Sequence, residues 1–182
     1  MSPFALLVLS GALVAAPEEA PPHPSQLKGE VAPLFVLPTL NPEAGLKRFV
    51  MRDWVGDTAR TPKKRVLLSF SASWCGPCRE ELARLGKLAP KLEAAGVGVA
   101  VVVIDNTDEG IHAMDRLTTE ELKLPFPVLK DRFQVLAKRY RVGKLPLSVV
   151  TDAEGVITFV HEGFSESGFE ALTAQLLGSP AS

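Results

Sequence analysis

The 182-residue chain has only two cysteines, Cys75 and Cys78, so neither can form an intramolecular disulfide except with the other. Histidine is also scarce: His23, His112 and His161 are not closely spaced with one another or with a cysteine, which argues against a four-ligand zinc site. Neither charge sign dominates, because 20 basic and 21 acidic side chains give a formal net charge of −1. This balance argues against a nucleic-acid partner.

The apolar run at residues 4–16 is too short to cross a membrane comfortably, and it ends in small side chains. We interpret it as a secretory signal peptide cleaved near Ala15 to Ala20, with an uncleaved anchor as the alternative because no Lys or Arg precedes the run. No cysteine follows at a position that would fit a lipoprotein anchor. Residues 17–27 are rich in proline and predict a flexible linker. The expected location is therefore periplasmic or otherwise extracytoplasmic.

Both cysteines belong to a Trp-Cys-Gly-Pro-Cys motif between a predicted buried strand at 65–71 and a predicted helix at about 76–95. Cys75 is therefore expected near the helix N-terminus, where free backbone N–H groups and the helix dipole favour a thiolate. Cys75 is predicted to be the nucleophile. Cys78, one turn further, is predicted to be buried and to resolve the mixed disulfide.

The two thiols could also serve as a structural disulfide or as copper ligands. A structural disulfide with so small a ring removes little chain entropy, which makes this role a poor explanation. Copper held by both thiols and a histidine such as His161 is chemically feasible. A redox role fits the isolated pair best.

The rest of the chain predicts alternating strands and helices closed by a hairpin, hence a three-layer α/β domain. Predicted strands lie at 97–104, 147–151 and 156–161, and predicted helices at about 107–121, 131–140 and 165–177. Before the motif we expect a short strand ending near Leu37, a second hairpin arm at 46–51, and a surface loop at 53–62 with a turn at Trp54. Pro90 is expected to bend or shorten the helix that follows the motif.

These residues resemble the thioredoxin-like superfamily. Pro146 within Val142–Ser148 resembles the family's cis-proline, and 152–157 resembles the hairpin after it. The leader at 30–35 and the extra segment at about 105–130 are similar to the exported TlpA/ResA-like thiol-disulfide oxidoreductases. The resemblance covers 28–178, leaving 179–182 as a tail. It implies a three-layer α/β/α sandwich with a mixed central sheet and an N-terminal β-hairpin extension.

The resemblance also implies supporting roles around the cysteines for Trp74, Gly76 and Pro77. A cis peptide between Leu145 and Pro146 would face the disulfide, and the Leu145 backbone could pair with an extended substrate like an added strand. The alternative is an ordinary trans-proline at the start of a strand.

The chain departs from the family pattern at several positions. Ser69 stands where thioredoxin has a buried acid, and Ala83 stands where the ResA-like branch often has a kinking proline. Leu147 replaces the frequent threonine after the cis-proline. Glu81 occupies the place of a glutamate that handles protons in the ResA-like branch, so we expect it to relay a proton for Cys78. The alternative is a solvated helix glutamate.

The resemblance implies a thiol-disulfide oxidoreductase that needs no cofactor and acts as a monomer. The Gly76-Pro77 dipeptide resembles that of reducing thioredoxins, which favours reduction of protein disulfides. A membrane thiol transporter would supply the electrons, and apocytochrome c cysteines are among the implied substrates. The alternatives are a peroxiredoxin-like peroxidase and a copper or other metal chaperone that uses the two thiols.

Overall fold

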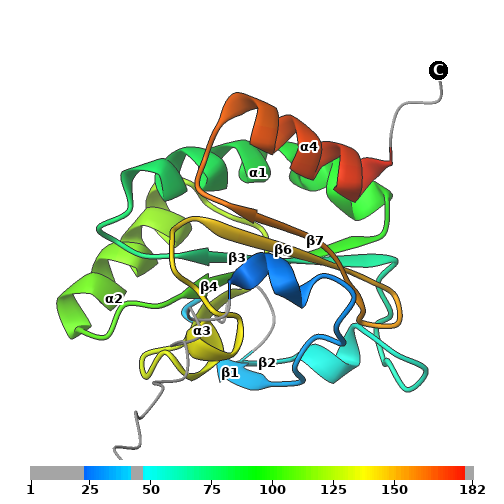
Figure 1. Ribbon diagram of the computed structural model, residues 1–182. Coiled ribbons are helices and arrows are strands. Elements are labelled where there is room, and N and C mark those ends of the chain that lie inside the picture. The colour runs from blue at the N-terminus through cyan, green and yellow to red at the C-terminus, as the bar shows by residue number, and fades with distance from the viewer. Residues whose placement is uncertain (1–22, 42–46, 179–182) are drawn as a thin grey trace, which may run out of the picture.

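The computed structural model describes residues 23–41 and 47–178. They form three layers, of which the middle one is a five-stranded sheet (Figure 1). The strand order is β5-β4-β3-β6-β7, where β3 is Arg65–Ser71, β4 is Val97–Val103, β5 is Val128–Lys130, β6 is Leu147–Asp152 and β7 is Ile157–Glu162. β3, β4 and β5 run parallel, whereas β6 runs antiparallel to both β3 and β7. The predicted mixed sheet is confirmed. The predictions for residues 1–22 and 179–182 fall outside the described residues.

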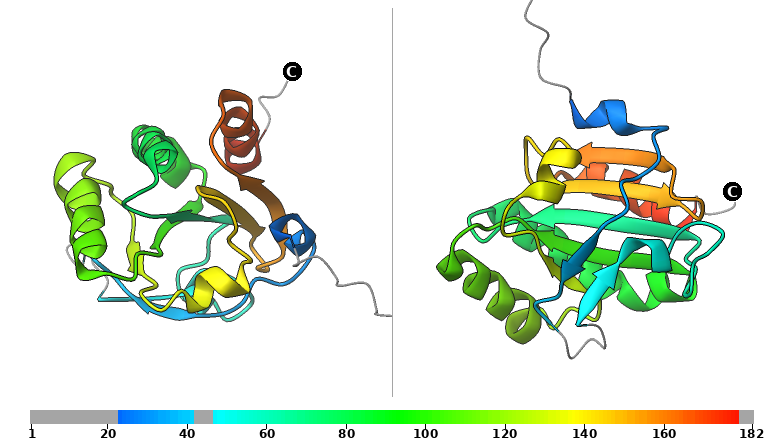
Figure 2. Two further views of the ribbon diagram at one scale, coloured as in Figure 1. Left: turned by 60° about the vertical axis from the view of Figure 1, so that its left-hand side comes forward. Right: turned by 90° about the horizontal axis from the view of Figure 1, so that it is seen from below.

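Helices cover the two faces of the sheet unequally (Figure 2). On one face lie α1 (Gly76–Ala94), α2 (Asp108–Asp115) with its π-helical continuation η4 (Arg116–Glu121), and α4 (Glu166–Leu177). On the other face lie α3 (Val135–Arg139) and the two-stranded hairpin of β1 (Val36–Pro38) and β2 (Arg48–Val50). The predicted N-terminal hairpin extension is therefore present, although Leu46 of its expected second arm lies outside the described residues.

The central strands are buried on both faces, which explains their nearly continuous apolar sequences. Alternate side chains enter different cores: Leu67 packs in the cluster that contains Leu82 and Leu85 of α1. Phe70 instead points to the opposite cluster, where its ring centroid lies 5.2 Å from that of Tyr140. The sheet thus separates two apolar cores and brings the ends of its strands to a common edge.

Two predictions between β4 and β6 need correction. Val128–Lys130 forms the short edge strand β5, which the sequence interpretation did not include because three residues are too few to show a periodic pattern. The helix expected over 131–140 is only α3, Val135–Arg139. Gln134 has a left-handed backbone conformation, with φ of 54°, which cannot continue a right-handed helix. Asp131 instead accepts a hydrogen bond from the Ala137 N–H and closes a turn.

Three smaller corrections concern the periphery. α1 continues past Pro90 to Ala94 and is not shortened. Pro24–Leu27, part of the expected flexible linker, forms a 3-10 helix (η1) in which Leu27 is buried. Trp54 is buried as well, because it packs on Gly98 of β4, where a Cβ atom would lie 2.6 Å from the indole.

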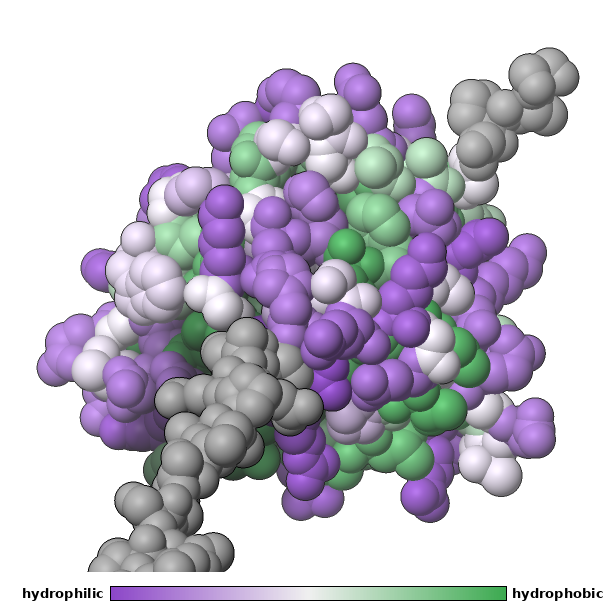
Figure 3. Space-filling view, viewed as in Figure 1, coloured by the Kyte–Doolittle hydropathy of each residue, from purple (hydrophilic) through white to green (hydrophobic). Residues whose placement is uncertain are grey.

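The surface seen in Figure 3 mixes hydrophilic side chains with small hydrophobic patches, and no single kind covers the whole face. Hydrophobic side chains gather near α4, where Leu88, Phe169 and Leu177 line a groove between α1 and α4. None of the helices in the described part of the chain is long and apolar enough to span a bilayer.

Candidate redox site

The two cysteines form a disulfide at the point where β3 passes into α1. The Cys75 N–H donates to the Ala72 carbonyl at 3.0 Å, which closes the turn between strand and helix. Cys75 is the N-cap of α1, and its Sγ accepts a hydrogen bond from the Cys78 N–H at 3.2 Å. Pro77 is tolerated here because the first helical N–H groups lack helical partners in any case.

The two sulfur-bearing residues differ in their access to solvent. Cys75 is 7% exposed and Cys78 only 1%. Gly76 and Pro77 between them are exposed, and Trp74 is 71% exposed. A partner can therefore approach Cys75 more readily than Cys78.

The turn before the motif is fixed by a buried acid at the end of β4. Asp105 accepts the Ser73 backbone N–H at 3.0 Å and the Ser73 hydroxyl at 2.6 Å. Gly110 in the first turn of α2 makes room for this carboxylate, because a Cβ atom there would overlap Asp105 Oδ1. The sequence interpretation assigned Asp105 no role, although its position directly after an apolar strand marks the sheet edge where functional side chains collect.

The Leu145–Pro146 peptide is cis, as predicted. Leu145 belongs to the same apolar cluster as Cys75 and Cys78, and the Pro146 carbonyl accepts the Gly163 N–H at 2.7 Å. Within the described residues, no hydrogen bond uses the Leu145 N–H or C=O. The backbone before the cis-proline therefore has free polar groups next to the redox motif.

Glu81 lies one helical turn after Cys78, on the buried face of α1, and is only 2% exposed. Its Oε1 accepts hydrogen bonds from the Ser69 hydroxyl at 2.8 Å and the Ser148 hydroxyl at 3.0 Å. These serines are directly paired across β3 and β6, so they present their hydroxyls side by side. The alternative of a solvated Glu81 is wrong.

Burial raises the pKa of Glu81, because a carboxylate loses its hydration in the core, and the two serine hydroxyls oppose this shift. A buried carboxyl whose pKa is raised can exchange a proton nearer to neutral pH than an exposed glutamate. Sequence reasoning placed Glu81 correctly on the helix but missed Ser148. The signal was available, since Ser148 is the one hydroxyl facing α1 in an otherwise apolar strand segment at 147–150.

No cluster of three or more His, Cys, Asp or Glu side chains with metal-binding geometry occurs among residues 23–41 and 47–178. His161, the histidine suggested for copper, lies on β7 with its Nε2 buried against Gly168 of α4. Both thiols are engaged in the disulfide.

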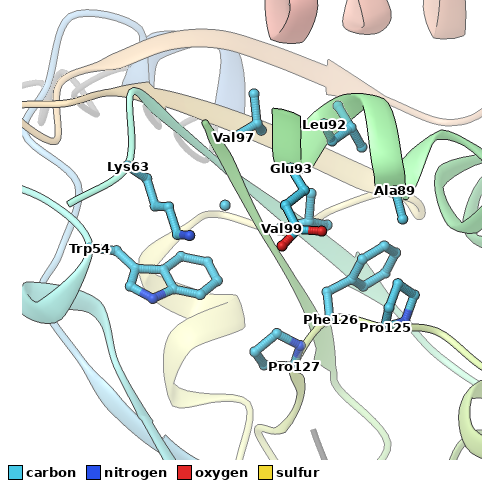
Figure 4. A pocket seen from close by; sticks show the side chains of 11 residues that line it. Trp54, Lys63, Ala89, Leu92, Glu93, Val97, Val99, Pro125, Phe126 and Pro127 are labelled. Atoms are coloured by element: carbon cyan, nitrogen blue, oxygen red, sulfur yellow. The ribbon is translucent and has the colours of Figure 1, made fainter. Parts of the chain in front are cut away.

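A cavity of about 170 Å³ lies at the other end of α1, between Trp54 and Phe126 (Figure 4). Lys63 stands over the Trp54 ring, with its Nζ 5.5 Å from the ring centroid. Leu92, which lines this cavity, is separated from Cys78 by roughly 20 Å of helix at 1.5 Å per residue. The cavity is thus remote from the disulfide, and the candidate site is the exposed edge around Cys75.

Comparison with known proteins agrees with this geometry. Residues 29–160 match the model of the AhpC/TSA family. The chain belongs to this family. It is 31% identical over 129 residues to the thiol-disulfide oxidoreductase ResA of Bacillus thuringiensis (strain Al Hakam), a match covering 71% of this chain and 66% of the relative, slightly less than two thirds of its length.

Two further similar proteins are also thioredoxin-like or thiol-disulfide proteins. The thioredoxin-like protein YneN of Bacillus subtilis is 33% identical over 137 residues, covering 75% of this chain and 72% of the relative. A crystal structure assigned as the thiol:disulfide interchange protein DsbE from Chlorobium tepidum superposes with a TM-score of 0.68 at 29% identity, covering 82% of this chain and 95% of that one. The chain is therefore a thioredoxin-fold homologue of ResA- and DsbE-type thiol-disulfide oxidoreductases.

Proposed function

We propose that this chain is an extracytoplasmic thiol-disulfide oxidoreductase that mainly reduces disulfides of exported proteins. The observation that carries the proposal is the Cys75–Cys78 disulfide at a helix N-terminus, beside the free backbone groups of Leu145. Homology to ResA supports the reaction class. The apolar N-terminal run supports export, and the Gly76-Pro77 dipeptide supports the reducing direction.

In the reduced enzyme, Cys75 is the attacking thiolate. The Cys78 N–H that donates to Cys75 Sγ, together with the dipole of α1, stabilises negative charge on that sulfur. The thiolate attacks one sulfur of the substrate disulfide. This attack forms a Cys75–substrate disulfide, breaks the substrate S–S bond and releases the other substrate sulfur as a thiolate that takes up a proton.

Cys78 resolves the mixed disulfide. Glu81 takes the proton of the Cys78 thiol, and the new thiolate attacks Cys75 Sγ, forming the Cys75–Cys78 disulfide and releasing the second substrate sulfur. The substrate gains two electrons and two protons. An external dithiol must then return the pair to its reduced state, and a membrane thiol transporter is the donor that the resemblance implies.

The substrate would lie as an extended segment against Leu145, with its backbone pairing to the free N–H and C=O groups there. Trp74, Gly76 and Pro77 would form the surface on the other side of Cys75. Apocytochrome c cysteines are substrates that fit this proposal, because they must be reduced outside the cytoplasm before haem is attached.

Trapping tests the roles of the two cysteines. Reduced Cys78→Ala protein is incubated with insulin, and covalent adducts are identified on non-reducing gels and by mass spectrometry. We expect an adduct through residue 75 and none with Cys75→Ala. An adduct through Cys78 in the Cys75→Ala protein would reverse the assignment.

The redox potential tests the direction of electron flow. A value near the roughly −270 mV of thioredoxin supports a reductant, whereas one near the roughly −120 mV of strong thiol oxidants overturns this direction. The second candidate function is a peroxidase, which the AhpC/TSA match supports. Rapid peroxide consumption by the same protein would favour this candidate instead.

A further inference from the structure

Phe133 is the most exposed large apolar side chain of the described residues, at 80%, and it follows the end of β5, the neighbour of β4 in the sheet. The exposed large apolar side chains fall into two groups along the chain. Val31, Leu34 and Val36 precede or begin the hairpin, while Trp74, Phe133 and Val135 follow the ends of β3 and β5. The second group is here called the edge patch.

Three hydrogen bonds bring the edge patch together at the end of β4. The Gln134 side-chain N–H donates to the Ile104 carbonyl at 2.9 Å, which fixes the residue next to Phe133. Asp105, the next residue after Ile104, accepts both hydrogen bonds of Ser73, the residue before Trp74. The loops that carry the two exposed aromatic rings are therefore anchored to adjacent residues.

The loop that presents Phe133 is held in place. The Asp131 N–H donates to the Val103 carbonyl, the Gln134 N–H to the Asp131 carbonyl, and the Ala137 N–H to the Asp131 carboxylate. Arg132 forms an ion pair with Asp108 of α2. The phenyl ring is thus displayed by an ordered turn, and an ordered, exposed aromatic side chain is typical of an interface anchor.

We propose that Phe133, with Val135 beside it, selects partner polypeptides that carry apolar side chains next to the disulfide to be reduced. This inference rests on the proposed function and specifies its substrate class. The occupant is an extended segment, because the unpaired Leu145 N–H and C=O groups offer strand-like pairing near the end of β3, the strand that leads to Trp74 and the disulfide. Extended pairing directs alternate side chains of the segment to one side, where the edge patch can receive them.

Two synthetic peptides with the same internal disulfide test the proposal, one with Leu and Phe beside the cysteines and one with Ser and Asn. Reduction rates are measured with the full chain in its reduced form, using wild type, Phe133→Ser, and Val31→Ser as a matched control at another exposed apolar position. A small aromatic disulfide, 5,5′-dithiobis(2-nitrobenzoate), reports the intrinsic reactivity of Cys75.

We expect wild type and Val31→Ser to prefer the apolar peptide, and Phe133→Ser to lose on the order of tenfold in rate on that peptide, the factor for about 1.4 kcal/mol of lost contact. Rates with the polar peptide and the small disulfide should not change. Equal rates for both peptides, unaffected by Phe133→Ser, overturn this inference and leave the oxidoreductase function standing. If neither peptide nor the small disulfide is reduced, the proposed function itself fails. A concentration-dependent dimer in sedimentation that Phe133→Ser abolishes assigns the edge patch to a second copy and also overturns the inference.

Discussion

The two serines that hold Glu81 give the sharpest test of the proton chemistry. Ser69 and Ser148 both donate to Oε1 of Glu81, so Ser148→Ala removes one of two donors from a buried carboxyl. A hydrogen bond to a charged group contributes about 1.5–3 kcal/mol, and one to a neutral group about 0.5–1.5 kcal/mol. The decrease in the free energy of unfolding caused by Ser148→Ala should therefore depend on whether Glu81 is ionised.

The direction of the pH effect follows from the raised pKa of Glu81. The folded state favours the protonated Glu81 carboxyl. The contribution of this carboxyl to the free energy of unfolding is therefore complete below the ordinary glutamate pKa of about 4.3, and it is lost as pH rises through the pKa of Glu81 in the folded protein. Removing a serine donor raises the Glu81 pKa further. Ser148→Ala should thus lower the free energy of unfolding by about 0.5–1.5 kcal/mol at low pH, where the lost hydrogen bond is to a neutral carboxyl. At high pH, where Glu81 is ionised, the loss should be about 1.5–3 kcal/mol.

The measurement is urea unfolding of oxidised wild type and Ser148→Ala between pH 4 and 9. Ser71→Ala is the matched control, because the Ser71 hydroxyl is buried on β3, the strand that carries Ser69, and has no hydrogen-bond partner among the described residues. Its effect should be small and independent of pH. In a Glu81→Gln background, the cost of Ser148→Ala should also lose its pH dependence.

The same variants test the kinetic role of Glu81. If Glu81 accepts the Cys78 proton, Ser148→Ala should move the pH profile of mixed-disulfide resolution to higher pH, because the pKa of the accepting carboxyl rises. Ser71→Ala should leave the profile in place. A cost of Ser148→Ala that is equal at every pH, with an unchanged resolution profile, would refute both the ionisation argument and the proton-acceptor role.

Two further outcomes follow from buried groups. Burial raises the pKa of Tyr140, the only tyrosine, so absorbance near 295 nm should show no tyrosinate in the folded protein at pH 11. Because the folded state favours the protonated phenol, stability should fall above pH ~10, and a titration step before unfolding would contradict this. Gly110→Ala should gain about 1 kcal/mol of helix propensity but lose about 1–3 kcal/mol to overlap with Asp105. Its unfolding temperature should therefore fall, while Gly143→Ala, which has space for a Cβ, should stay near wild type; a more stable Gly110→Ala would show that Asp105 can move at no cost.

The sequence alone identified the elements that have strong local patterns. The apolar strands β3 and β4 and the capped helix α4 match their predicted ranges within a residue or two, because periodic burial and cap residues are local signals. It missed β5 and the late start of α3. A three-residue strand exists only through its pairing with β4, and the left-handed Gln134 depends on its contact with Ile104.

The sequence by itself determined the thiol pair and its place at the start of a helix, since Cys75 and Cys78 have no other partner and are flanked by a strand and a helix pattern. Only the tertiary structure decided that Glu81 is buried. The distinction between a core carboxyl and a solvated one depends on Ser69 of β3 and Ser148 of β6, which both contact this helix residue. The same holds for Asp105 and Phe133, which lie 30 and 58 residues from Cys75 in the sequence. Contacts between segments so far apart are formed by the packing of the sheet, and no local pattern encodes them.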